Sequence, residues 1–233
     1  MDFKSFRKKS FVDAKKTIRE SVGEDEYILH AINTIDDLNR IANLLTKRLR
    51  DWYAIYYPEL SMNIEDHEAF IKAALKETRQ GETMGKDLDK KDLEPILIFA
   101  KEIERLYQFR EELKDYLNDV TKNYCKNMHY LIGPLLCAKL IREAGSLRAL
   151  AMMHASKLQL LGAETALFRH LKTGSRPPKH GIILQHPLVG SAKEKGKAAR
   201  AVSDKISILA RVDYFKGEFI AEKIKADLEE KLK

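Results

Sequence analysis

Two long heptad patterns constrain this sequence more than any other feature. In the first, apolar side chains recur every seven residues from residue 28 to residue 56. A second set of apolar side chains recurs at the same interval, each three residues C-terminal to a member of the first. The two sets are Ile28, Ile35, Ala42, Leu49 and Tyr56, and Ala31, Leu38, Leu45 and Trp52. This a/d repeat predicts one amphipathic helix over residues 22–57, which Pro58 would end.

The second heptad pattern starts near Leu93, with Pro95 tolerated in the first turn. Its two sets are Ile96, Ile103, Leu117 and Tyr124, and Phe99, Leu106, Leu113 and Val120. Arg110 interrupts the first set, and one polar residue in such a seam can fix the register of the pairing. Two helices of matched length and pattern predict a long antiparallel coiled-coil hairpin over residues 22–130. Two helices of a compact bundle are the alternative.

The segment between the two patterns, residues 58–91, is interpreted as an insertion at the tip of the hairpin. Its apolar spacing predicts one short helix over Glu65–Arg79, and the polar, glycine-containing stretch 81–92 predicts a flexible tip. Residues 1–21, which precede the hairpin, are basic and are expected to form a frayed arm.

Residues 131–233 show a different organisation. The Gly133-Pro134 pair predicts a kink or break, and Ser146 is a natural N-cap after a glycine. Further helices are expected over residues 163–172, 192–210 and 218–233, whereas the stretch ILQHPLV is ambiguous between a strand and a buried loop. No convincing pair of strands occurs, so the predicted fold class is all-α: a coiled-coil hairpin followed by a compact helical domain.

Charge is divided unevenly along the chain. From residue 139 onward there are 19 Lys and Arg against 10 Asp and Glu, a net charge of +9. The totals of 42 and 35 leave 23 basic and 25 acidic residues for the preceding part, a net charge of −2. This asymmetry favours a polyanionic partner for the second part, although a solvated basic surface is the simpler alternative.

Signatures of catalysis, cofactor binding and metal binding are missing from the sequence. The stretch GSAKEKGKA differs from a phosphate-binding loop in glycine spacing, and Ala198 stands where a magnesium-binding Ser or Thr is required. The seven histidines show no ligand spacing, and Cys125 and Cys137 are expected to be reduced, buried thiols. We therefore expect no enzyme activity, catalytic residue, cofactor or metal, and no membrane span, since no run of eighteen apolar residues occurs.

Two basic clusters are the candidate binding residues. One lies in LFRHLKTGSRPPKHG, where Arg169 and Lys172 can share a helix face while Leu167, Phe168 and Leu171 are expected to pack. The start of that helix is expected to offer free N–H groups at Gly162, Ala163 and Glu164, suited to a phosphate. The loop then adds Arg176, Lys179 and His180, and a second cluster includes Lys197 and Arg200. An ordinary pattern of helix-end charges is the alternative for either cluster.

Three strings in this half carry a resemblance to a known family. GAE-x-ALFRHL, PPKHG and GK-x-AR…AR-x-DYF lie between Ser146 and Phe215, and together they resemble the Nop domain family. The resemblance is closest to the Nop-type core proteins of archaeal box C/D ribonucleoproteins. It implies an RNA-binding scaffold that supports guide-directed 2′-O-ribose methylation, with residues 131–233 as the Nop domain. It also implies a cytoplasmic protein in archaea and a nucleolar one in eukaryotes.

The resemblance also implies partners and roles for residues. The Nop domain is expected to bind a composite of box C/D guide RNA, folded as a kink-turn, and a small kink-turn-binding protein of ribosomal type. The RNA contacts it implies are Gly162, Ala163, Glu164, Arg169, His170, Lys179, His180, Lys197 and Arg200, to which the basic cluster itself adds Lys172 and Arg176 as predicted contacts. The coiled coil is expected to form a homodimer, through Ile28, Ile35, Leu38, Leu45, Leu49, Ile103, Leu106, Leu113 and Leu117.

The chain departs from the family pattern in two informative places. Thr165 stands where the family has Lys after Gly-Ala-Glu, which removes one expected phosphate contact. The coiled coil begins after about twenty residues, so direct recruitment of the methyltransferase fibrillarin, a property of the family's N-terminal domain, is not expected here. Two other functions stay open: a protein-binding coiled-coil adaptor without RNA contact, and a splicing-type Nop protein on a small nuclear RNA.

Overall fold

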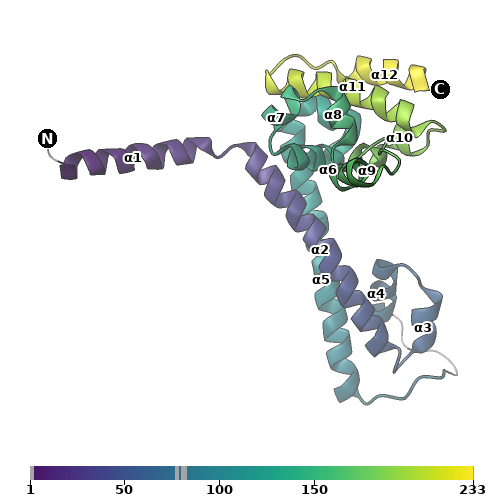
Figure 1. Cartoon of the computed structure of the whole chain (residues 1–233). Coiled ribbons are helices and arrows are strands. Elements are labelled where there is room, and N and C mark those ends of the chain that lie inside the picture. The colour runs from purple at the N-terminus through teal and green to yellow at the C-terminus, as the bar shows by residue number, and fades with distance from the viewer. Residues whose placement is uncertain (1–2, 77–78, 80–82, 233) are drawn as a thin grey trace. The chain divides into compact units, whose positions relative to one another are not determined.

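The computed structural model describes residues 3–76, 79 and 83–232, and every regular element in this part of the chain is a helix (Figure 1). The predicted all-α class is therefore confirmed. The longer helices are α1 (Phe3–Ser21), α2 (Glu24–Tyr53), α5 (Lys90–Tyr124), α6 (Lys126–Ala144), α11 (Lys195–Tyr214) and α12 (Ala221–Leu232). The shorter ones are α3 (Pro58–Asn63), α4 (His67–Lys76), α7 (Leu147–Met152), α8 (Ala155–Leu160), α9 (Glu164–Thr173), the 3₁₀ helix η1 (Ile182–Gln185) and α10 (Pro187–Gly190).

Contacts divide the chain into two compact units, which we describe separately. The hairpin unit comprises residues 33–115, and the large unit comprises residues 1–32 and 116–233. Both long helices, α2 and α5, contribute to both units. The functional domains predicted at residues 22–130 and 131–233 are a different kind of division and stay a prediction.

In the hairpin unit, α2 and α5 run antiparallel. The Tyr107 hydroxyl donates to Asn43 Oδ1 at 3.1 Å, and Arg110 Nη1 donates to Asn39 Oδ1 at 3.1 Å. Residues later in α5 thus pair with residues earlier in α2, as an antiparallel arrangement requires. The predicted heptad positions Ala42, Leu49, Ile96 and Ile103 lie in the core of this unit, together with Ala100, which the two repeats did not include.

The predicted end of the first long helix is wrong. Helix α2 ends at Tyr53 rather than at residue 57, and Pro58 is the first residue of α3. A residue before proline is driven out of the helical conformation, and Tyr57 accordingly has φ −145° and ψ 80°. The chain leaves α2 through a tight turn, in which the Tyr56 and Tyr57 N–H groups both donate to the Tyr53 carbonyl. Pro58 therefore begins an element instead of ending one.

The predicted single helix over 65–79 is confirmed with shorter bounds, because α4 (His67–Lys76) is the helix in that range, and α3 (Pro58–Asn63), which was not predicted, precedes it. Asp66 Oδ1 accepts the Ala69 N–H at 2.7 Å and so caps the start of α4. Arg50 holds the turn between the two helices, donating to the Ser61 and Glu65 carbonyls at 3.0 and 2.9 Å. Residues 77 and 78 of the predicted helix lie outside the described residues.

Residues 83–92, the part of the predicted tip that the structure describes, are held to neighbouring segments by side-chain hydrogen bonds and an ion pair. Glu59 accepts hydrogen bonds from the Thr83 hydroxyl at 2.7 Å and from the Met84 N–H at 2.8 Å. Arg79 pairs with Asp87 at 2.6 Å. Residues 81 and 82 lie outside the described residues, and α5 already begins at Lys90.

The large unit is built around α11, which packs against α6, α7 and α8 (Figure 1). Small and branched side chains such as Ala199, Val202 and Ile206 bury one face of α11 completely. The predicted kink occurs in α6, where Gly133 has φ 75°. The predicted N-cap is confirmed as well, because the Ser146 hydroxyl accepts the Ala149 N–H at 3.0 Å.

Several predicted bounds in the large unit need correction. Helix α11 covers Lys195–Tyr214 rather than 192–210, and α12 covers Ala221–Leu232 rather than 218–233. The ambiguous ILQHPLV stretch is neither strand nor loop but η1 followed by α10, since Pro187 is suited to the first turn of a helix. The two cysteines are free and buried, as predicted, with their Sγ atoms 3.1 Å apart.

The N-terminal segment is helical, so the expectation of a frayed arm is wrong. No glycine or proline interrupts residues 3–21, and the helix stops before Gly23. Every side chain described in α1 is exposed. No helix in the described part of the chain is long and apolar enough to cross a membrane.

His186 makes a pH-dependent contribution to stability. Its ring is buried, Nε2 lies 3.1 Å from the Leu131 carbonyl, and Nδ1 accepts the Leu188 N–H at 3.3 Å. Because a carbonyl only accepts, the ring is neutral with its proton on Nε2. Burial lowers the pKa of His186, partly opposed by the bond to Leu131, and the charge of Lys225 lowers it further.

A folded state whose histidine has a lowered pKa binds fewer protons than the unfolded chain. The stabilisation is therefore present above the unfolded pKa of about 6.5 and is lost as the pH falls below it. We expect the free energy of unfolding to drop less between pH 7 and pH 5 in a His186→Asn variant than in the unchanged protein. Urea unfolding at both pH values tests this, with exposed His154→Asn as the control. An equal drop in all three proteins contradicts the assignment.

Candidate nucleic-acid interface

The turn from α8 into α9 places the first set of predicted residues. Gly162 has φ +80°, and a Cβ there would lie 2.4 Å from Ile182 Cγ2, so only glycine fits. The Ala163 N–H donates to the Leu160 carbonyl at 2.9 Å, which closes the turn. Gly162 and Ala163 therefore have a clear structural role, whether or not they also touch RNA.

The expectation of three free N–H groups at the start of α9 is wrong. The Glu164 carboxylate accepts the Gly162 N–H at 2.9 Å, and the Ala163 N–H is already bonded within the turn. Glu164 thus occupies, with its own negative charge, the position that a phosphate would take. Two of the three expected N–H groups are therefore already bonded within the turn, and the prediction that Glu164 contacts RNA stays a prediction.

Helix α9 buries none of its residues, which corrects a second expectation. Phe168 is 60% exposed and Leu171 is 70% exposed, so two of the three side chains expected to pack face solvent instead. Leu167 is half-buried, and Arg169 and Lys172 are exposed. The helix therefore presents apolar and cationic side chains together.

His170 fastens the end of α9 to the loop that follows. Its Nδ1 makes a short contact with the Ser175 carbonyl, so Nδ1 carries the proton and donates it. Gly174 ends the helix in the left-handed conformation, with φ 67°. In an Nδ1-protonated neutral ring, Nε2 is an acceptor, a role suited to a ribose hydroxyl.

The loop RPPKHG is pinned to α8 at its far end. The Gly181 N–H donates to the Gln159 carbonyl at 2.8 Å, and the Ile182 N–H donates to the Leu161 carbonyl at 2.9 Å. A Cβ at Gly181 would lie 1.9 Å from the Leu161 oxygen, so the approach requires glycine. The prolines and these bonds together hold the loop in one conformation before any partner binds.

The two predicted basic clusters meet at an open cleft of about 460 Å³. The loop contributes Lys179, and the first turns of α11 contribute Lys197 and Arg200. The rest of the lining consists of Ser156, Gln159 and Leu160 of α8, Pro178 of the loop and Gly196 of α11. Lys179 belongs to the first basic cluster of the sequence, whereas Lys197 and Arg200 belong to the second. The fold brings the three side chains to one cleft.

The other predicted residues do not line this cleft. Arg176 is exposed on the loop and His180 is half-buried beside Lys179. Arg169, His170 and Lys172 lie on α9, outside the cleft lining. The structure therefore places some of the predicted RNA contacts on α9 and others in the cleft, with Arg176 and His180 on the loop between α9 and η1.

Gln159 is the cleft residue that sequence reasoning missed. Its amide nitrogen lies 2.6 Å from the Lys179 carbonyl and 3.4 Å from the Gly196 carbonyl. A single glutamine in the stretch SKLQLLG carries no pattern that points to either partner, 20 and 37 residues away. Among the described residues, no group of three or more His, Cys, Asp or Glu side chains could hold a metal ion.

Three cations around one cleft in an all-α protein suit a polyanion better than a small neutral ligand. Lys179, Lys197 and Arg200 are exposed, and the nearby acidic group is Glu194, 3.6 Å from Lys197. Such an exposed pair is weak and exchanges readily for a phosphate. The fold and the cleft thus define the class of protein: a helical binding protein with a preformed cationic surface.

The chain belongs to the Nop family, whose model, described as "snoRNA binding domain, fibrillarin", matches residues 34–82 and 73–233. An uncharacterized NOP5 family protein of Methanocaldococcus jannaschii is 39% identical over 254 residues, covering 96% of this chain and 61% of that protein. Nucleolar protein 58 of Schizosaccharomyces pombe is 37% identical over 215 residues, covering 81% of this chain and 42% of that protein.

A further relative agrees with this assignment, and a solved structure shows the same fold. Nucleolar protein 56 of Saccharomyces cerevisiae is 33% identical over 225 residues, covering 83% of this chain and 45% of that protein. A crystal structure of a fibrillarin/Nop5p complex has the same fold, with a TM-score of 0.62 at 24% identity, over 99% of this chain and 77% of that chain. This chain thus spans 61% or less of the curated relatives it matches here.

Proposed function

We propose that this chain is an RNA-binding scaffold of a box C/D ribonucleoprotein, which supports guide-directed 2′-O-ribose methylation. One observation carries the proposal: Lys179, Lys197 and Arg200, from two distant segments of a Nop family chain, line the same open cleft. A loop stiffened by two prolines and bonded to α8 loses little entropy when RNA binds. The scaffold reading assigns the chemistry of methylation to a partner.

The proposed partners are a box C/D guide RNA folded as a kink-turn and the small ribosomal-type protein that binds it. Exposed Phe168 and Leu171 beside Arg169 and Lys172 support a mixed surface, suited to protein and RNA at once. The complex with fibrillarin, which is the subject of the related Nop5p structure, is a further proposed assembly for the whole protein. The eukaryotic relatives are named as nucleolar proteins, which supports a nucleolar setting if the chain is eukaryotic. For an archaeal chain, like the Methanocaldococcus jannaschii relative, the proposed setting is cytoplasmic.

A double substitution in the cleft tests the RNA-binding proposal. We expect Lys197→Ala with Arg200→Ala to weaken assembly on kink-turn RNA and its small protein roughly tenfold, because two phosphate contacts are lost. Gel-shift titration measures this. The control is Arg148→Ala with Lys223→Ala, which removes one Arg and one Lys that are exposed on α7 and α12. Equal affinities of the two variants would place RNA binding elsewhere and would favour the adaptor function.

We also propose that the chain forms a homodimer through the hairpin. The residues that we propose for this contact differ from the nine heptad residues predicted from the sequence. Six of the nine predicted dimerisation residues are buried within one chain, so they already form its internal seam: Ile28, Ile35, Leu38, Leu49, Ile103 and Leu117. Leu45, Leu106 and Leu113 are half-buried. The residues predicted for contact between chains are thus mostly unavailable to a second copy.

An exposed stripe on α2 is the better candidate for self-association. Ile41, Leu44 and Trp52 are 49%, 57% and 43% exposed, and their spacing puts them on one face of the helix. We call these three residues the outer stripe. Large apolar side chains in a row on a solvent-facing helix are typical of a protein interface.

Charge placed in the outer stripe should prevent dimer formation. We expect Ile41→Glu with Leu44→Glu to convert a dimer to a monomer, because two buried carboxylates would oppose each other across the interface. Size-exclusion chromatography with light scattering measures the mass. Met62→Glu, which alters an exposed apolar residue of α3, serves as the matched control. A monomeric unchanged protein, or a dimeric double variant, argues against this interface.

A further inference from the structure

We propose that Gln159 is a positioning residue for RNA binding, which holds the two cationic segments of the cleft at a fixed spacing. The inference rests on the proposed RNA-binding function and deepens it. Gln159 carries no charge, so it adds no phosphate contact of its own. It acts on Lys179, whose carbonyl it holds, and on Lys197 through the carbonyl of the preceding residue, Gly196.

The contacts of Gln159 reach both sides of the cleft. Its side-chain nitrogen donates to the Lys179 carbonyl at 2.6 Å and lies 3.4 Å from the Gly196 carbonyl. Its own backbone carbonyl accepts the Gly181 N–H at 2.8 Å. One residue of α8 therefore binds the loop on both sides of His180 and the first turn of α11.

The geometry requires an amide at this position. Two backbone carbonyls need two N–H donors, which a glutamine NH₂ group supplies. A carboxylate of the same shape would set acceptor against acceptor, and an apolar side chain would leave both carbonyls without this partner. The length of the side chain matters as well, because it must reach from α8 to the carbonyls of Lys179 and Gly196.

The Lys179 side chain also lies beside Gly196. A Cβ placed on Gly196 would lie 3.5 Å from the Cβ and Cδ atoms of Lys179, an ordinary van der Waals distance, so the two segments are about one methyl group apart. Gln159 holds the backbone of both segments at this spacing. Lys197 follows Gly196 immediately. The same hydrogen bonds therefore set the distance between the backbone positions from which the Lys179 and Lys197 side chains extend.

Cations that are spaced in advance bind a phosphate backbone without a reorganisation cost. Loss of the Gln159 amide should therefore weaken RNA binding while the number of charges is unchanged. We expect Gln159→Leu and Gln159→Glu to lower affinity for kink-turn RNA with its small protein by roughly fivefold to tenfold. The glutamate variant should be the weaker, since it adds a negative charge to the cleft.

The matched control is Gln185→Leu, because Gln185 also makes a side-chain hydrogen bond, to Lys139 at 3.0 Å, without lining the cleft. Gel-shift titrations should leave its affinity unchanged. Circular dichroism on heating should give Gln159→Leu nearly the melting temperature of the unchanged protein. A variant that loses affinity only in proportion to lost folded protein would have a merely structural role and would overturn the proposal.

A double-mutant cycle separates this inference from the proposed function. In a Lys179→Ala, Lys197→Ala background, adding Gln159→Leu should cost less than about twofold, because the groups it positions are gone. A full additional loss would overturn the positioning role while leaving the cleft as the RNA site. If the lysine double variant itself bound RNA normally, the proposed site and this inference would both fail. If the lysine double variant lost affinity but the Gln159→Leu single variant bound RNA normally, the positioning role of Gln159 would fail and the proposed site would stand.

Discussion

Replacing Asp213 by Ala should lower the free energy of unfolding by about 3–5 kcal/mol, because it leaves several buried donors without an acceptor. The Asp213 carboxylate is buried and accepts the Asn127 and Met128 N–H groups at 3.1 and 2.9 Å. These are the second and third residues of α6. A negative charge at this helix start also interacts favourably with the positive end of the helix dipole.

The same carboxylate holds a second connection. Asp213 Oδ1 accepts the Asn127 side-chain amide at 2.8 Å, and the Asn127 side-chain oxygen accepts the Ile220 and Ala221 N–H groups. Asp213 on α11 is thus linked directly to the start of α6 and, through Asn127, to the start of α12. One substitution should loosen three helices of the large unit together.

Urea unfolding followed by circular dichroism measures this loss. The control is Asp204→Ala, which removes an exposed carboxylate from the same helix and should change stability by less than about 0.5 kcal/mol. Similar midpoints for the two variants would mean that the buried carboxylate contributes little to the fold.

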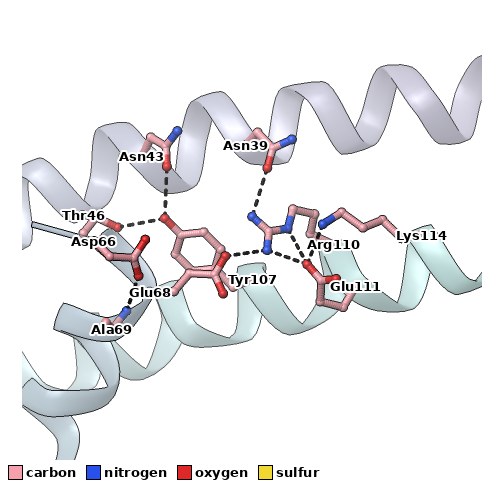
Figure 2. Close-up of polar contacts among 10 residues, drawn as sticks. All are labelled: Asn39, Asn43, Thr46, Asp66, Glu68, Ala69, Tyr107, Arg110, Glu111 and Lys114. Carbon is pink, nitrogen blue, oxygen red and sulfur yellow. Dashed lines mark hydrogen bonds and ion pairs between the residues drawn. The ribbon is translucent and has the colours of Figure 1, made fainter. Parts of the chain in front are cut away.

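Replacing Arg110 by Ala should destabilise the hairpin unit by about 2–3 kcal/mol, since its guanidinium makes several charged hydrogen bonds with little exposure to water. The side chain is 11% exposed. It donates to Asn39 on α2 at 3.1 Å and to Glu68 on α4 at 2.6 Å, and it also bonds Glu111 (Figure 2). Its charge lies 4.9 Å from the centre of the Tyr107 ring.

A double-mutant cycle with Glu68→Gln isolates the contact between α5 and α4. We expect the two substitutions to be non-additive by about 1 kcal/mol or more, because they remove the same interaction. Thermal unfolding of the four proteins measures the coupling. Lys101→Ala, an exposed cation of α5, is the control for loss of a charge. Strictly additive effects would show that Arg110 and Glu68 do not stabilise each other.

Arg110 also illustrates what the heptad pattern could and could not predict. A polar residue inside an apolar repeat indicates a specific polar contact, and that contact exists with Asn39. The contact with Glu68 could not be predicted, because it depends on how α3 and α4 fold back after Pro58. Local periodicity determines which face of a helix is buried but not which distant element covers it.

The candidate site shows the same division. Its cations follow from charge and from the resemblance, but their meeting in one cleft depends on hydrogen bonds at Gln159 and Gly181 that no pattern reveals. The expected set of three free N–H groups at the start of α9 was wrong because the Glu164 carboxylate accepts the Gly162 N–H and the Ala163 N–H is bonded to Leu160. The string AR-x-DYF also has a structural explanation, since Arg211 donates to the Ala151 carbonyl at 3.0 Å and Asp213 caps α6.

A gel-shift titration on a box C/D kink-turn RNA, with and without its small kink-turn protein, at two salt concentrations, tests the scaffold function most directly. We predict a shift by this chain that requires the small protein and weakens as salt rises, as phosphate contacts demand. A complex that forms equally well at both salt concentrations, or no supershift under any condition, would contradict the proposal and favour a coiled-coil adaptor that binds only proteins.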